Sequence, residues 1–223
     1  MEMDIIKTGN LKKSYMLGKV EVKALNGVDV SIQKGEFVAI MGPSGCGKST
    51  FLNMVGMLDI PTSGEIYVEG NDVTGMSSNK RAEYRLRHIG FIFQFFNLFN
   101  ELTAIENIMF PMMLNRMPNY RKNAQELLNL VGLGDRIHHL PSELSGGQQQ
   151  RVTIARSLAN SPKILLADEP TGNLDTKSSK EIIELFRKLN LERGQTIVMV
   201  THSQEIGEKA DRIIHFRDGI IEK

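Results

Sequence analysis

Short apolar runs alternate with longer segments of helical spacing along much of the chain. The runs EFVAIMG (36–42), KILLAD (163–168) and TIVMVTH (196–202) are apolar almost throughout, which predicts strands buried on both faces. KSTFLNMVGML (48–58) and SSKEIIELFRKLNLERG (178–194) repeat apolar positions every three or four residues, which predicts helices. Strands and helices that alternate in this way indicate an α/β fold with a mostly parallel sheet.

The two ends and the middle of the chain have different patterns. Residues 1–41 contain short alternating runs such as VDVSI, which predict an N-terminal antiparallel β region. NAQELLNLVGLG (123–134) has helical spacing and glycines at its end, and most of 80–160 is similar. RIIHFRDGIIEK (212–223) predicts a hairpin that turns at Asp218-Gly219. We therefore expect a single domain, with a core of about 1–94 and 161–223 and an inserted helical subdomain of about 95–160.

Composition narrows the class of protein without identifying it. The chain has 223 residues, 41% of them hydrophobic and 24% charged, which is ordinary for a globular protein. A net charge of +1 gives no indication of a nucleic-acid partner. The single cysteine suits a reducing compartment, and no apolar run approaches the roughly 20 residues that span a bilayer. We expect a soluble, intracellular chain.

The strongest chemical motif is GPSGCGKS (42–49), which matches the phosphate loop G-x-x-x-x-G-K-[ST]. It follows a predicted strand and precedes a predicted helix, as that motif requires. Its glycines let backbone N–H groups surround a phosphate, Lys48 can reach the β- and γ-phosphates, and the Ser49 hydroxyl can bind Mg²⁺. The alternative is a glycine turn that matches the motif by chance.

A second motif, ILLADEP (164–170), places two acids at the end of a predicted strand. Asp168 would lie beside the phosphate loop and hold Mg²⁺. Glu169 follows at once, and because side chains alternate along a strand we expect it to face elsewhere, where a carboxylate can polarise an attacking water. The alternative is a pair of solvated acids at a strand end.

A third motif, LSGGQQQR (144–151), contains no acid, general base or metal ligand. Ser145 suits a helix N-cap, Gly146-Gly147 permits close backbone approach, and QQQRVTIARSLAN (148–160) has helical spacing. Such a helix start attracts an anion with at most about 2 kcal/mol, whereas micromolar binding requires about 8 kcal/mol. The site would therefore assist at a phosphate bound elsewhere, unless the stretch is only a flexible connector.

The motif LSGGQ, placed between a phosphate loop and an ILLADEP strand, resembles the signature of ATP-binding cassette (ABC) ATPases. The resemblance covers essentially the whole chain, and its details are most similar to the cassettes of macrolide exporters and lipoprotein-releasing complexes. It implies ATP and Mg²⁺ as cofactors, ATP hydrolysis as the activity, and a head-to-tail homodimer. In such a dimer each signature contacts the γ-phosphate held by the partner.

The resemblance implies roles for further residues. Gln94, at the end of IGFIFQ, is similar to the glutamine that meets Mg²⁺ and the attacking water. Tyr15 is similar to the aromatic residue that stacks on adenine, with Val22 beside the base. His202 resembles the histidine that contacts the γ-phosphate, and Asp175 resembles a dimer-interface aspartate, although the residues before it in GNLD depart from the common form. Read singly, Gln94 and His202 would be ordinary strand-end residues, and Tyr15 could equally be packing.

These assignments define the expected site. Catalytic roles fall on Lys48, Gln94, Glu169 and His202, and Mg²⁺ binding on Ser49, Gln94 and Asp168. Nucleotide contacts are expected from Tyr15, Val22, Gly42, Pro43, Ser44, Gly45, Cys46, Gly47, Lys48, Ser49, Thr50, Gln94, Ser145, Gly146, Gly147, Gln148, Asp175 and His202. Cys46 stands where serine is frequent, and it places the only thiol in the phosphate loop.

The helical subdomain is the expected contact with a membrane permease. Six of the ten phenylalanines lie between 91 and 110, followed by a group of methionines, and Met-rich surfaces suit partner helices. The resemblance implies that this region and the loop after Gln94 receive a helix of the permease at the inner face of the cell membrane. An ABC ATPase that works without transport is the alternative. A DNA-repair ATPase would need a long coiled-coil insertion, and a small-molecule kinase would lack LSGGQ.

Overall fold

The computed structural model describes residues 4–222 and has a six-stranded sheet at its centre. The strand order is β10 (Ile220–Ile221), β9 (Arg212–Arg217), β3 (Phe37–Met41), β8 (Thr196–Val200), β7 (Ile164–Asp168) and β6 (Ile89–Ile92). Every pair is parallel except β9 with β10, which form the predicted hairpin around Asp218-Gly219. The α/β fold with a mostly parallel sheet is confirmed.

A second sheet is antiparallel and contains the N-terminal region. Its order is β2 (Val20–Gln33), β1 (Asp4–Leu17), β4 (Ser63–Val68) and β5 (Asn71–Asp72). The predicted short strands are in fact two strands of 14 residues, β1 and β2. They stay paired through several register shifts, one of them beside Asn10, whose φ is 45°. The N-terminal antiparallel region is confirmed, with longer strands than the sequence pattern indicated.

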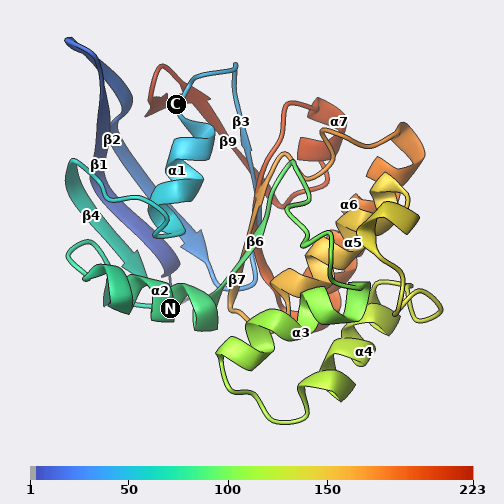
Figure 1. Ribbon diagram of the computed structural model, residues 1–223. Coiled ribbons are helices and arrows are strands. Elements are labelled where there is room, and N and C mark those ends of the chain that lie inside the picture. The colour runs from blue at the N-terminus through green and yellow to red at the C-terminus, as the bar shows by residue number, and fades with distance from the viewer. Residues whose placement is uncertain (1–3, 223) are drawn as a thin grey trace.

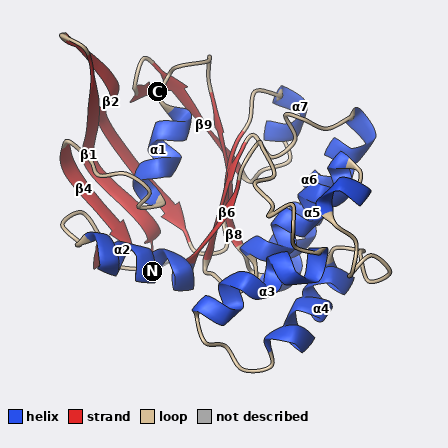
Figure 2. Ribbon diagram, viewed as in Figure 1, coloured by secondary structure: helices blue, strands red, loops and turns tan. Residues whose placement is uncertain are grey.

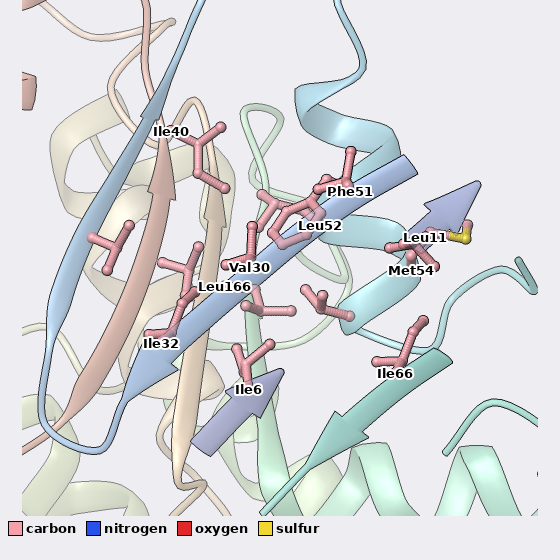
Figure 3. Packing of buried hydrophobic residues seen from close by; sticks show 14 of the residues in the cluster. Ile6, Leu11, Val30, Ile32, Ile40, Phe51, Leu52, Met54, Ile66 and Leu166 are labelled. Carbon is pink, nitrogen blue, oxygen red and sulfur yellow. The ribbon is translucent and has the colours of Figure 1, made fainter. Parts of the chain in front are cut away.

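Helix α1 (Lys48–Val55) lies between the two sheets (Figure 1). Its residues Phe51, Leu52 and Met54 pack against the inner face of β2 and against one face of the parallel sheet. Figure 3 shows these side chains among Ile6, Val30 and Ile32 of the antiparallel sheet and Ile40 and Leu166 of the parallel sheet. The helix is shorter than predicted because Met57 adopts a φ of 56° and turns the chain away. This core fixes the helix that follows the phosphate loop.

The opposite face of the parallel sheet is covered by helices (Figure 2). They are α3 (Ala104–Leu114), α4 (Tyr120–Leu130), the 3₁₀ turn η1 (Pro141–Glu143), α5 (Gly146–Ser157) and α6 (Thr176–Arg193). Two other helices, α2 (Ser78–His88) and α7 (Gln204–Gly207), lie at the periphery. Ile108 and Leu128 of the inserted region share one hydrophobic cluster with Leu165 and Ile197 of the sheet. The inserted helices are therefore packed onto the core, and the boundaries of the subdomain stay a prediction.

A buried asparagine shapes the loop between β6 and α3. The Asn107 side chain accepts from the Phe99 N–H and donates to the carbonyl oxygens of Phe99, Leu102 and Thr103. Thr103 is the N-cap of helix α3 and forms a capping box with Glu106. The loop that follows Gln94 is thereby tied to the first turn of α3. Within residues 4–222, no helix is long and apolar enough to cross a membrane.

Helix α5 approaches the sheet closely at Gly90 of β6, and a substitution there tests this packing. A Cβ at Gly90 would lie 2.4 Å from the Ser157 carbonyl oxygen and 2.6 Å from Leu165 Cδ2. We expect Gly90→Ala to lower the free energy of unfolding by about 1–3 kcal/mol in urea titrations, because α5 must move. Gly75→Ala is the control, since nothing lies within 4 Å of that position. Equal stability of the two variants would contradict this packing.

Candidate functional site

The phosphate loop joins β3 to α1 and packs closely against β2 at Ala24. Gly47 has a φ of 104°, and a Cβ there would lie 2.4 Å from the Ala24 carbonyl oxygen, so this position requires glycine. The Lys48 side chain is buried, and its ammonium donates to the carbonyl oxygens of Gly42 (2.8 Å) and Pro43 (2.7 Å). A cation and the free N–H groups of a helix N-terminus thus lie together, which is an arrangement that binds phosphate.

Asp168 ends β7 and meets the start of α1. Its Oδ1 accepts a hydrogen bond of 3.0 Å from Ser49 Oγ, as expected from the sequence. Burial raises the pKa of Asp168 and the Glu169 carboxylate adds to that effect, although Ser49, Lys48 and His202 act in the opposite direction. The negative charge of Asp168 is therefore only partly compensated by the side chains around it.

Glu169 departs from the predicted alternation. The strand ends at Asp168, and Glu169 has a left-handed φ of 48°, which turns its side chain toward the phosphate loop. Its Oε1 lies 2.5 Å from His202 Nε2. One pocket is lined by both of these residues and by the phosphate loop; its lining consists of Ser44, Gly45, Gly47, Lys48, Ser49, Thr50, Glu169 and His202. Glu169 and Asp168 therefore meet different partners, but the cause is the left-handed backbone at Glu169 and not alternation along a strand.

Tyr15 and Val22 face each other across β1 and β2. The register pairs Tyr15 directly with Val22, and both side chains are exposed. The Tyr15 hydroxyl donates to Asp59 Oδ2 at 2.9 Å. These contacts make an exposed aromatic surface at the end of the antiparallel sheet, where an adenine contact was expected.

Gln94 lies beyond the strand that was expected to end with it. β6 ends at Ile92, and the Gln94 carbonyl oxygen accepts from Asn173 Nδ2 at 2.9 Å. The Gln94 side chain lies against Gly172, where a Cβ would come within 2.9 Å of its Nε2. Gln94 therefore packs against the loop that follows Glu169, and it does not line the pocket of the phosphate loop.

Cys46 is buried beneath the phosphate loop. Its side chain is 3% exposed, and its sulfur lies 3.8 Å from Lys48 Nζ. The thiol therefore packs inward, and Cys46 does not line the pocket of the phosphate loop. Gly42 and Pro43 likewise do not line the pocket, and their carbonyl oxygens accept from the Lys48 ammonium.

The LSGGQ stretch forms the start of α5. Ser145 is the N-cap, its Oγ accepts from the Gln148 N–H at 3.4 Å, and Gln148 Oε1 accepts from the Ser145 N–H at 3.0 Å. The predicted helix start is thus confirmed as a capping box. A Cβ on Gly147 would lie 2.8 Å from Ser178 Oγ, whereas one on Gly146 would make ordinary contacts. Gly147 is therefore needed for packing against α6 of the same chain.

Asp175 is the N-cap of α6. Its carboxylate accepts from the N–H and the hydroxyl of Ser178, at 2.9 and 2.7 Å, and the backbone bond to Ser178 contributes most to lowering the pKa of Asp175. Through Ser178, Asp175 and Gly147 belong to one packed group. This group lies with α5 and α6 on one face of the parallel sheet, whereas α1 lies on the other (Figure 1).

Gln150, the third glutamine of the stretch, has a structural role that the sequence motif did not indicate. Its side chain is fully buried, and its Nε2 donates to the Pro170 carbonyl oxygen at 2.7 Å. Helix α5 is thereby linked to the turn that carries Asp168 and Glu169. The helical pattern requires burial at position 150, and a glutamine there was the one indication of such a role. The pattern could not identify its partner, which is 20 residues away.

The oxygen donors at this site suit Mg²⁺, and they are too few to hold a metal with protein ligands alone. Ser49 and Asp168 supply two converging oxygen atoms, and among residues 4–222 no three His, Cys, Asp or Glu side chains gather as a metal site. Mg²⁺ commonly takes one or two protein ligands and completes its shell with phosphate oxygens and water. The raised pKa of Asp168 also indicates a carboxylate whose charge a cation would compensate.

A phosphate loop at the carboxyl edge of a parallel sheet, with a carboxylate at the neighbouring strand end, defines a phosphate-loop nucleoside triphosphatase. The sequence matches the family described as ABC transporter over residues 25–172. The chain belongs to the ABC transporter family.

Similar proteins support this assignment along the whole chain. The lipoprotein-releasing system ATP-binding protein LolD 1 of Rhodopseudomonas palustris is 46% identical, with 98% of both chains covered. The macrolide export ATP-binding/permease protein MacB of Bdellovibrio bacteriovorus is 49% identical over 98% of this chain, which spans 33% of MacB. A dimeric ATP-binding cassette solved in a post-hydrolysis state with ADP and Pi is 45% identical, with a TM-score of 0.90 over 98% of this chain and 97% of that one. The expected likeness to macrolide-export and lipoprotein-releasing cassettes is confirmed.

From the raised pKa of Asp168 we predict how the free energy of unfolding changes with pH. Since the folded state holds this proton more tightly than the unfolded chain, wild-type stability falls as pH rises from about 4 through the folded pKa. Asp168→Asn removes this penalty, so we expect the variant to gain stability relative to wild type between pH 4 and pH 7. Urea titrations without nucleotide or Mg²⁺ measure the difference. A difference that is constant with pH would contradict the assigned burial of the charge.

Proposed function

We propose that this chain binds Mg²⁺ and ATP at its phosphate loop and hydrolyses ATP in a head-to-tail dimer that drives a membrane permease. The observation that carries the proposal is that the phosphate loop, Glu169 and His202 line one pocket. Membership in the ABC transporter family supports ATP as the nucleotide and hydrolysis as the reaction.

Phosphate binding falls to the loop and α1. The first N–H groups of α1 and the Lys48 ammonium would donate to the phosphate oxygens, which are stronger acceptors than the carbonyl oxygens that Lys48 now contacts. Ser49 and Asp168 would hold Mg²⁺, which neutralises charge that develops on the phosphates. Gln94 is proposed as a further ligand, reached by movement of its loop relative to Asn173, to which its carbonyl oxygen is now bonded.

Glu169 is the proposed group that orients the attacking water. Its carboxylate lines the phosphate-loop pocket, and the contact with His202 Nε2 at 2.5 Å would hold it in position. A carboxylate can accept a proton from water as the oxygen attacks the γ-phosphate. His202 is exposed and lines this pocket, so its imidazole would also contact that phosphate.

The proposed dimer follows from the positions of α1 and α5. Because these helices pack on opposite faces of one sheet, the start of α5 in LSGGQ would serve a phosphate outside its own chain. The helix start satisfies itself with a capping box and still presents free N–H groups to an anion. The solved relative is described as a dimeric cassette bound to ADP and Pi, which supports dimer formation.

An apolar groove between α2, β6 and α3 is the proposed contact with the permease. It is lined in part by Phe91, Phe93, Phe110 and Leu114, and Phe110 and Leu114 are exposed. An exposed apolar groove of this kind suits a helix of a partner protein. The named relatives, a lipoprotein-releasing protein and a macrolide export permease, favour transport over an ATPase that works alone. This assembly would place the chain at the cytoplasmic face of the membrane.

Hydrogen bonds connect the loop beside this groove to α5, the helix that begins in LSGGQ. Arg156 of α5 donates to the carbonyl oxygens of Phe96 and Asn97, at 3.1 and 2.5 Å, in the loop after Gln94. Burial lowers the pKa of Arg156. A permease helix that moves this loop would therefore move α5 with it, and so change the position of LSGGQ relative to the partner's nucleotide.

Substitution of Glu169 tests the proposed chemistry. Glu169→Gln keeps the shape of the side chain but removes the base, so we expect ATP binding to persist and hydrolysis to slow roughly 10²–10⁴-fold. The loss of one negative charge per site should also stabilise the ATP-bound dimer on a sizing column. Glu192→Gln, an exposed change on α6, should leave turnover unaltered. Near wild-type turnover of Glu169→Gln would remove Glu169 from the catalytic role.

A further inference from the structure

Tyr15 is held by a small charged cluster that the proposed function does not explain. One carboxylate oxygen, Asp59 Oδ2, accepts from the Tyr15 hydroxyl at 2.9 Å and lies 2.8 Å from Lys13 Nζ. The same ammonium lies 4.8 Å from the centre of the Tyr15 ring, within the range of a cation–π contact. The Lys13 side chain is 12% exposed, so this pair is partly shielded from water.

Asp59 connects this ring to the end of the phosphate-loop helix. Its N–H donates to the Asn53 carbonyl oxygen of α1 at 3.3 Å, and its other carboxylate oxygen accepts from the Ile60 N–H at 2.7 Å. Burial alone would raise the pKa of Asp59, but Lys13 and the Ile60 and Tyr15 hydrogen bonds outweigh it and lower the pKa. The carboxylate is thus held charged and fixed between α1 and β1.

The geometry points to Asp59 and Lys13 as positioning residues for the base of the nucleotide. Asp59 fixes the Tyr15 hydroxyl relative to α1, so the ring keeps a constant position with respect to the phosphate loop. Lys13 lies over the ring, and 38% of Tyr15 remains exposed for stacking with a purine. Val22, directly opposite on β2, bounds this surface. The inference rests on the proposed ATP site and extends it to residues outside the nucleotide contacts.

This role differs from a purely structural clamp in one measurable respect. A clamp that only stabilised α1 would affect every ligand of the phosphate loop equally. If Asp59 and Lys13 position the Tyr15 ring, their loss affects only ligands that carry a base, because base–aromatic stacking is an added contribution to binding. Inorganic triphosphate, which has phosphates but no base, separates the two.

The experiment compares dissociation constants for Mg-ATP and for Mg-triphosphate by calorimetry. For Asp59→Asn and Tyr15→Phe, which lose the charge and the hydroxyl respectively, we expect ATP to bind about 3–20-fold more weakly. Triphosphate should bind as in wild type, which also shows that the variants fold. The KM for ATP should rise in step, with kcat unchanged. Asp72→Asn is the matched control, an exposed aspartate whose side chain bonds only to Thr74, and it should change neither constant.

A double variant makes the test sharper. In a Tyr15→Ala background, Asp59→Asn should cause no further loss of ATP affinity, because its effect acts through the ring. Equal weakening of ATP and triphosphate, an unchanged ATP affinity, or a full additional loss in that background would each overturn the inference. A wild-type chain that binds triphosphate but not ATP would overturn it together with the ATP site, whereas unaltered ATP binding by Asp59→Asn would leave the proposed function intact.

Discussion

The parallel pairing of β3, β8 and β7 is the constraint on which the rest of the site depends. Ile40 of β3 is in register with Val200 of β8, and Val200 is in register with Asp168 of β7. The three strands consequently end at one level of one sheet edge, where the phosphate loop, His202 and Glu169 follow them. Parallel strands expose their carboxyl ends together, so this pairing brings the phosphate loop, the proposed Mg²⁺ ligand Asp168 and the proposed water-orienting carboxylate of Glu169 to the same place.

The same sheet also separates the two halves of the proposed composite site. A buried parallel sheet must be covered on both faces. Here α1 covers one face and α5 and α6 the other, so the phosphate loop and LSGGQ of one chain are held apart (Figure 1). A hydrogen bond still connects α5 to the edge of the sheet that carries the phosphate loop, since Gln150 of α5 donates to the carbonyl oxygen of Pro170, next to Glu169. The proposed dimer thus uses a separation that the fold itself imposes.

The parts of this structure that were predicted from the sequence depend on local pattern. The strand–loop–helix unit at 36–55, the acid at the end of β7 and the N-cap at Ser145 each follow from residues close together in the chain. The parts that were not predicted depend on backbone conformation or distant contacts. The left-handed Glu169, the contact of Gly147 with Ser178 and the Tyr15–Asp59 bond across 44 residues leave no periodic trace in the sequence. Cys46 was placed correctly in its loop, but its burial depends on how that loop closes over Lys48.

The central claim is that LSGGQ of one chain completes the ATP site of another, and the most direct measurement mixes two inactive variants. Gln148→Glu preserves the capping box with Ser145 but adds a negative charge where the partner's phosphate would lie, whereas Lys48→Ala damages the phosphate loop. In a mixed dimer both changes fall on one site, and the other site is intact. The account predicts that each variant alone is inactive, that Gln148→Glu monomers bind ATP normally, and that mixing restores part of the ATPase activity. No recovery in mixtures shown by differential tagging to contain the mixed dimer, or loss of ATP binding by the Gln148→Glu monomer, would contradict it.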